Sequence, residues 1–190
     1  DWSQLAAAYR QAIADSLDLE LSVQDVGFDA IQGGTAYASG TCDMGVSAIT
    51  ITEERQANLD FSDPYYDSLQ SLLVAEDSGI TGIADLAGQP VAVQATTTGE
   101  AYAQENAPDA ELISYPGDAE MWPALQGGTV VAILQDLPVN VTHAQDDPSY
   151  VIVEEYDTEE SYGFAFGKET NPNLIAAVNE TLQTMRDDGS

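Results

Sequence analysis

The stretch that decides the fold is Ser47–Tyr66, SAITITEERQANLDFSDPYY. It contains Arg55, in a chain that has 4 Lys plus Arg against 33 Asp plus Glu. Alternating apolar and hydroxyl residues predict a strand end, and Thr52 followed by two acids predicts an N-cap that opens a short helical turn. A guanidinium held there offers a planar fork that fits a carboxylate, while an exposed Arg that pairs with surface acids is the open alternative. We therefore expect Arg55 to meet an anion.

The same stretch carries a longer pattern. T-x-x-R at Thr52–Arg55 is followed, after a short spacer, by the D-F-S-D-P-Y-Y box at Asp60–Tyr66. This pattern resembles the signature of the family 3 extracellular solute-binding proteins, the polar amino-acid receptors of ABC importers. The resemblance covers residues 28–185 and implies an α/β, two-lobe periplasmic-binding-protein-like (type II) fold with two interlobe crossovers. It implies lobe 1 at 1–75 plus 156–190 and lobe 2 at 76–155, with the family's first strand missing.

The charge of the chain limits its partners. A hydrophobic content of 44% indicates a folded chain despite the formal net charge of −29. That charge argues against nucleic acid and anionic membrane surfaces as partners, because both need a basic footprint. Such an acidic surface repels itself unless salt screens it, so we expect a halophilic protein. A moderately acidic secreted protein from a low-salt organism is the open alternative.

The lone Cys42 excludes an intrachain disulfide, and a buried inert thiol is expected. No apolar run approaches the roughly 20 residues of a membrane span, so we expect no membrane insertion of this segment. The resemblance implies an extracellular or periplasmic monomer, with its signal peptide and any lipid anchor outside the sequence that begins at Asp1.

Periodicity predicts the remaining elements. Helical spacing predicts helices over 3–15, 28–37 (weakened by Gly33 and Gly34), 117–125 and 171–187. Alternation and apolar runs predict strands over 19–23, 43–47, 69–75, 90–94, 111–114, 129–134, 151–153 and 162–166. The acidic residues 154–160 are expected to form a solvated connection instead of a metal site, because they lack the spacing of a calcium loop. The alternation of strands and helices predicts largely parallel strands.

Three consecutive threonines, Thr96, Thr97 and Thr98, come directly before a helical segment that ends near Asn106. Hydroxyls and free backbone N–H groups at a helix N-terminus form a ready anion site, although one threonine could simply be the cap. The resemblance supports the functional interpretation, since the family carries a G-T-T box here, with Ala95 in place of the glycine.

Asp136 follows a buried strand at its carboxyl end, which is where open α/β sheets bind ligands. The helix that starts at Leu137 and Pro138 could equally use Asp136 as its N-cap. The pair Gln135 and Asp136 resembles the family's placement of an ammonium-binding aspartate.

The resemblance implies that Arg55 grips an α-carboxylate with help from Thr97 and Thr50, and that Asp136 accepts the α-ammonium. Closure of the two lobes on the ligand would then be sensed by an ABC transporter permease. Further family pocket positions fall at Ser47, Ala48, Phe28 and Val93. Glutamine, another polar amino acid or a zwitterionic osmolyte such as ectoine fits this clamp, and no cofactor or metal is expected.

Two other functions use the same scaffold. A cyclohexadienyl dehydratase-like enzyme would need a general acid or base, and the one histidine, His143, lies late in a predicted helix without an evident partner. We therefore expect no enzyme activity. A receptor sensor domain would share the fold but would be fused to membrane segments.

Overall fold

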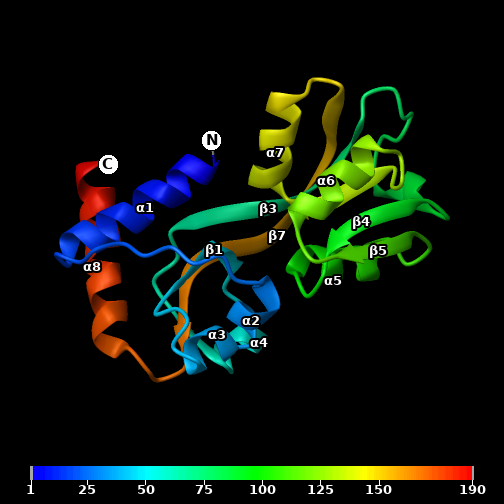
Figure 1. The fold of residues 1–190 in the computed structure, drawn as a ribbon. Helices are drawn as coiled ribbons and strands as arrows, with labels where there is room; N and C mark the ends of the chain where they lie inside the picture. Colours follow the sequence, from blue (N-terminus) through cyan, green and yellow to red (C-terminus); the bar gives the residue numbers. More distant parts are fainter. Residues whose placement is uncertain (1, 190) are drawn as a thin grey trace. The chain divides into compact units, whose positions relative to one another are not determined.

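The computed structural model describes residues 2–189, with side chains described from residue 6 onward. The chain divides into two compact units (Figure 1): unit 1 comprises Asp1–Asp67 and Glu160–Ser190, and unit 2 comprises Ser68–Glu159. The boundaries lie inside two long strands, β3 (Tyr66–Ala75) and β7 (Tyr150–Gly167). The chain therefore leaves unit 1 once and returns once. Among the described residues, no helix has the length and apolar character needed to cross a membrane.

Unit 1 is built around the last part of β7. Its elements are α1 (Trp2–Ser16), α2 (Phe28–Gln32), α3 (Thr35–Ala38), β1 (Gly45–Thr50), α4 (Glu53–Gln56), β2 (Leu59–Phe61) and α8 (Pro172–Asp188). Strands β1 and β2 both pair with β7. Helices α1 and α8, blue and red in Figure 1, contribute Ile13, Val178 and Leu182 to a core with Phe164 and Phe166 of β7.

Three expectations about these strands are wrong. Residues 19–23 form no strand, and Leu19 and Val23 are each 61% exposed, because alternation makes a strand only where a neighbour completes the backbone hydrogen bonds. Strands β1 and β2 are antiparallel to β7, not parallel. Their partner is the strand by which the chain returns to unit 1, and not a strand that follows them through a crossover helix. The acidic residues 154–160 belong to β7: Tyr156 is buried between the exposed Glu155 and Asp157, and Glu160 is buried after the exposed Glu159, so the alternation outweighs the charge.

Unit 2 is a sheet with helices on both faces. Its elements beyond β3 are the 3-10 helix η1 (Ile83–Leu86), β4 (Pro90–Gln94), α5 (Thr98–Asn106), β5 (Glu111–Tyr115), α6 (Asp118–Gln126), β6 (Ala132–Asp136) and α7 (Leu137–Asp146). Strand β4 is parallel to β5 and β6, and β6 is antiparallel to β3.

Successive residues of the central strands supply two separate cores of unit 2. Leu72 and Leu134 face the core that includes Ala103 of α5, whereas Leu73 and Ile133 face the core that includes Met121 of α6. A strand buried on both faces reads as one continuous apolar run, which is why TVVAIL at 129–134 predicted β6. Strand β6 thus ends, at Asp136, between two packed layers of helices.

Candidate functional site

Arg55 lies in a short helix whose start is set by Thr52. The Thr52 Oγ1 accepts a hydrogen bond from the Arg55 backbone N over 3.2 Å, so the predicted N-cap is confirmed. The Arg55 side chain is buried, at 7% exposure, and its Nη1 donates to the Thr50 carbonyl over 2.9 Å. The guanidinium carbon lies 5.2 Å from the centre of the Phe28 ring, within the range of a cation–π contact. The alternative of an exposed surface arginine is therefore excluded.

All four Lys and Arg side chains fall in the described part of the chain, and Arg55 is the buried one. Arg10 is half-buried, whereas Lys168 and Arg186 are exposed. Lys168 pairs with Asp60 over 3.0 Å, and Arg186 donates to the Pro64 carbonyl. Burying a cation costs free energy, and a buried cation does not help to keep the surface soluble. The burial of Arg55 therefore needs another explanation.

Strand β1 brings two further predicted site residues to the same part of unit 1. Ala48 is half-buried and has φ 50, at the point where the register of β1 on β7 shifts between Gly45 and Ile49. Ser47, next to it, is exposed. A left-handed backbone is uncommon for a residue other than glycine, and such strain gathers at binding sites. In unit 1, Arg55 therefore contacts Thr50 and Phe28, and Ser47 and Ala48 lie on β1, the strand that ends at Thr50.

The three threonines have different roles in unit 2. Thr97 is the N-cap of α5: its Oγ1 accepts from the Glu100 N over 3.2 Å and donates to the Gln94 carbonyl over 2.7 Å. Thr96 is exposed, has φ 63, and donates its backbone N–H to the Glu100 carboxylate over 2.7 Å. The backbone that favours glycine is therefore at Thr96, not at Ala95. Val93, just before this turn, is 0% exposed and packs in the core.

Asp136 ends β6 and occupies the N-cap position of α7, yet its side chain makes no capping hydrogen bond. Its Oδ1 instead accepts from the Gln70 Nε2 over 2.6 Å. The same Nε2 lies 3.5 Å from the Thr98 Oγ1 at the start of α5. Capping therefore does not account for this carboxylate. Gln70 was not predicted from the sequence, although a glutamine inside the apolar run LQSLLV is a usable signal.

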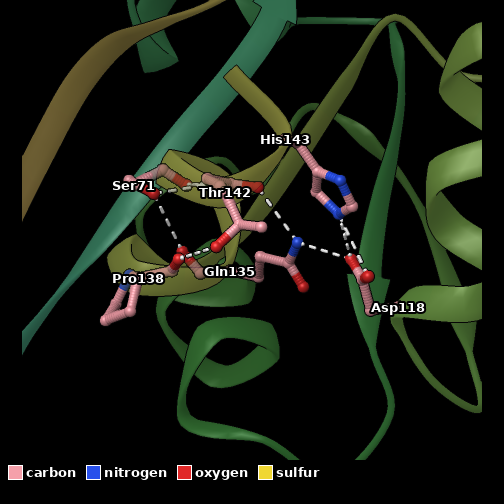
Figure 2. A network of polar contacts seen from close by, with 7 residues as sticks. Ser71, Asp118, Gln135, Pro138, Thr142 and His143 are labelled. Atoms are coloured by element: carbon pink, nitrogen blue, oxygen red, sulfur yellow. Dashed lines mark hydrogen bonds and ion pairs between the residues drawn. The ribbon is translucent and has the colours of Figure 1, made fainter. Parts of the chain in front are cut away.

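A second polar network lies beside this one in unit 2. The Nε2 of His143 lies 2.8 and 3.0 Å from the two oxygens of Asp118, and the Nε2 of Gln135 donates to Asp118 over 2.9 Å. Figure 2 shows these three side chains converging. Gln135 also donates to the Asn140 Oδ1 over 3.0 Å, and the Asn140 Nδ2 donates to the Ser71 Oγ over 2.9 Å. The expectation that His143 lacks a partner is wrong. Its partner is 25 residues away on another helix, which no local pattern reveals.

The environment of Asp118 favours its ionised form. Burial alone would raise the pKa of this carboxyl, but the hydrogen bonds from His143 and Gln135 and the charge of His143 outweigh it and hold the pKa below its ordinary value. The indole of Trp122 stacks on the His143 ring with centroids 4.2 Å apart. Among the described residues, no group of three or more His, Cys, Asp and Glu side chains could hold a metal ion.

The two candidate groups differ in chemistry. Unit 1 offers a buried guanidinium beside an aromatic ring, which suits a carboxylate. Unit 2 offers a carboxylate at a strand end, held by an amide and flanked by a helix N-terminus with threonine hydroxyls. Each group by itself therefore suits one kind of charge: the group in unit 1 an anion and the group in unit 2 a cation.

Comparisons with known proteins agree with this chemistry. The family model described as bacterial extracellular solute-binding proteins, family 3, matches residues 5–190. The ABC transporter glutamine-binding protein GlnH of Bacillus subtilis is 33% identical over 152 residues, which are 80% of this chain and 55% of that protein. A glutamine-binding protein of Geobacillus stearothermophilus is 35% identical over 74% of this chain and 54% of its own length. The chain thus spans about half the length of these curated relatives.

A solved structure extends the likeness to the fold. An ancestral arginine-binding protein bound to glutamine has a TM-score of 0.87 and 32% identity, over 97% of this chain and 81% of its own. The relatives named here are solute-binding proteins, not enzymes. The fold is the mixed α/β fold of the amino-acid-binding proteins. Family model, relatives and fold all agree, so this chain belongs to the bacterial extracellular solute-binding proteins, family 3.

Proposed function

We propose that the chain captures an amino acid outside the cytoplasm and delivers it to the permease of an ABC transporter. The observation that carries the proposal is the burial of Arg55, at 7% exposure, in a chain of net charge −29. Such a chain gains nothing in solubility from a buried cation, but a ligand carboxylate gains a desolvated, two-pronged partner. The names of the relatives, which are glutamine- and arginine-binding proteins, point to the same ligand class.

In this proposal Arg55 holds the α-carboxylate and Asp136 holds the α-ammonium. Arg55 is suited to its role because its Nη1 is fixed on the Thr50 carbonyl and its guanidinium lies over Phe28, so little side-chain entropy remains to be lost on binding. Asp136 is suited to its role because its carboxylate is fixed by Gln70 instead of capping α7. The Thr98 hydroxyl and the β1 residues Ser47 and Ala48 would complete the contacts, whereas the Thr50 and Thr97 hydroxyls would first have to give up their bonds to Glu160 and Gln94.

The test is titration calorimetry of the purified chain with the standard L-amino acids and with ectoine. We expect an L-amino acid to bind with micromolar affinity, and we expect Arg55→Ala or Asp136→Ala to abolish that binding. A charge-assisted hydrogen bond is worth about 1.5 to 3 kcal/mol, so even the milder Arg55→Lys, which keeps the charge but loses the fork, should weaken binding roughly tenfold or more.

The matched control is Lys168→Ala, which removes an exposed cation from the same unit and should leave affinity unchanged. Circular dichroism must show native folding for each variant. Binding that survives both Arg55→Ala and Asp136→Ala would refute the assignment of the two groups. Binding of ectoine in preference to every amino acid would change the ligand class from a nutrient to an osmolyte.

A further inference from the structure

We infer that Gln70 is a positioning residue that aims the Asp136 carboxylate at the ligand's ammonium group. This inference rests on the proposed function, because it concerns how the ammonium site is prepared. It starts from the contact between the two side chains, in which the Gln70 Nε2 donates to the Asp136 Oδ1 over 2.6 Å.

The contact is fixed by the sheet. Gln70 of β3 stands directly opposite Asp136 of β6 in the antiparallel register, and the next pair is Ser71 opposite Gln135. Directly opposed residues place their side chains close together on the same face. Gln70 is 0% exposed, so its amide has no bulk water to turn to. A change of side chain at position 70 therefore alters the contact with Asp136 and leaves the solvent-exposed surface unchanged.

The start of α5 closes the other side of Gln70. A Cβ added at Gly99 would lie 2.6 Å from the Gln70 Oε1 and 3.5 Å from the Gln135 Cα, which is too close for the glutamine to keep its position. The Thr98 Oγ1 lies 3.5 Å from the Gln70 Nε2. The absence of a side chain at Gly99 thus leaves the space that the Gln70 amide oxygen occupies while its amide nitrogen meets Asp136.

The chemistry of an amide explains why glutamine suits this place. Asp136 occupies an N-cap position, where an aspartate carboxylate usually accepts from the backbone of the following helix turn. The Gln70 amide supplies a competing donor that holds the carboxylate away from the cap. The amide is neutral, so the carboxylate keeps its negative charge for an ammonium ion, whereas Lys or Arg at position 70 would neutralise it.

The test compares Gln70→Met with Gln135→Met. Methionine keeps the length of glutamine and loses the donor. Gln135 is a buried glutamine on the neighbouring strand whose amide binds Asp118 and Asn140 instead, so its replacement reports the general cost of losing a buried amide. With the standard L-amino acid that the unmodified chain binds best, Gln70→Met should weaken binding at least about tenfold, and Gln135→Met less than about twofold.

Two further readouts separate positioning from a structural role. Removing a donor from a carboxylate raises its pKa, so Gln70→Met should lose binding at a higher pH on the acid side than the unmodified chain. In an Asp136→Asn background with residual binding measured at high ligand concentration, adding Gln70→Met should change affinity less than twofold, because the residue acts through Asp136. Gln70→Asn, whose shorter amide cannot reach Asp136, carries the same expectation if the methionine variant does not fold.

Each outcome decides the question. Undiminished binding by a folded Gln70→Met or Gln70→Asn, or an equal loss in the presence and absence of the Asp136 carboxylate, overturns the role of Gln70 and leaves the proposed function standing. Failure of the unmodified chain to bind any amino acid overturns the proposed function and this inference together.

Discussion

The Thr50 hydroxyl donates to the Glu160 carboxylate over 2.8 Å, although the two residues are 110 positions apart in the sequence. Both are buried, at 4% and 6% exposure, and they lie on the paired strands β1 and β7. The Thr50 carbonyl accepts from Arg55, so Thr50 connects the Arg55 side chain to strand β7. The assistance of the Thr50 hydroxyl to a ligand carboxylate stays a prediction, and it would require this hydroxyl to release Glu160.

Replacing Thr50 by valine tests this link. Thr50→Val keeps the shape of the side chain but deprives the buried Glu160 carboxylate of a donor, so the free energy of unfolding should fall by about 1 to 3 kcal/mol in urea titrations. Thr50→Ser, which keeps the hydroxyl, is the control and should lose less. Equal stability of the valine and serine variants would contradict a stabilising role for the bond.

Acid should weaken unit 2 through Asp118. The pKa of this carboxyl is lower in the folded chain than its ordinary value of 3.8, because donors from His143 and Gln135 outweigh the opposing effect of burial. The unfolded chain therefore binds more protons, so the stabilisation is fully present above pH 3.8 and is lost as the pH falls through the lower folded pKa.

The variant Asp118→Asn isolates this effect. Its free energy of unfolding should lie below that of the unmodified chain at neutral pH, and the gap should narrow as the pH falls below 3.8. Asp146→Asn, at an exposed position of α7, should leave the profile unchanged. A gap between Asp118→Asn and the unmodified chain that is constant with pH would count against this account.

Thr96 holds a left-handed backbone, with φ 63, that its branched side chain disfavours. We expect Thr96→Gly to raise the free energy of unfolding by up to about 1 kcal/mol, because relief of the strain exceeds the extra entropy of glycine in the unfolded chain. Thr98→Gly, at the first residue of α5, should instead lower the free energy of unfolding, because glycine adds entropy to the unfolded chain and no left-handed strain is relieved there. Thermal unfolding of the two variants gives the comparison, and a destabilised Thr96→Gly would show that the threonine contacts matter more than the strain.

The acidic surface predicts a response to salt. With a net charge of −29, the folded chain repels itself at low ionic strength, so the free energy of unfolding should rise between dilute buffer and molar KCl. An uncharged osmolyte such as sucrose at matched osmolality controls for effects other than screening. A stability that stays flat across the KCl series would end the proposal of a halophilic protein.

The sequence by itself determined features whose causes lie within a few residues. Thr52 as N-cap and the short helix that carries Arg55 were predictable, because a cap needs only its own helix turn. The helix interrupted after Gln32 followed from Gly33 and Gly34. The long D-F-S-D-P-Y-Y box identified the family, which the family model confirms.

Only the tertiary structure decided what the site side chains contact. Gln70 meets Asp136 across 66 residues, and Asp118 meets His143 across 25. The acidic stretch 154–160 became part of the long strand β7, which its charge did not foretell. Such pairings depend on which strands become neighbours and in which register, and strand order is set by burial of the whole sheet instead of by local spacing.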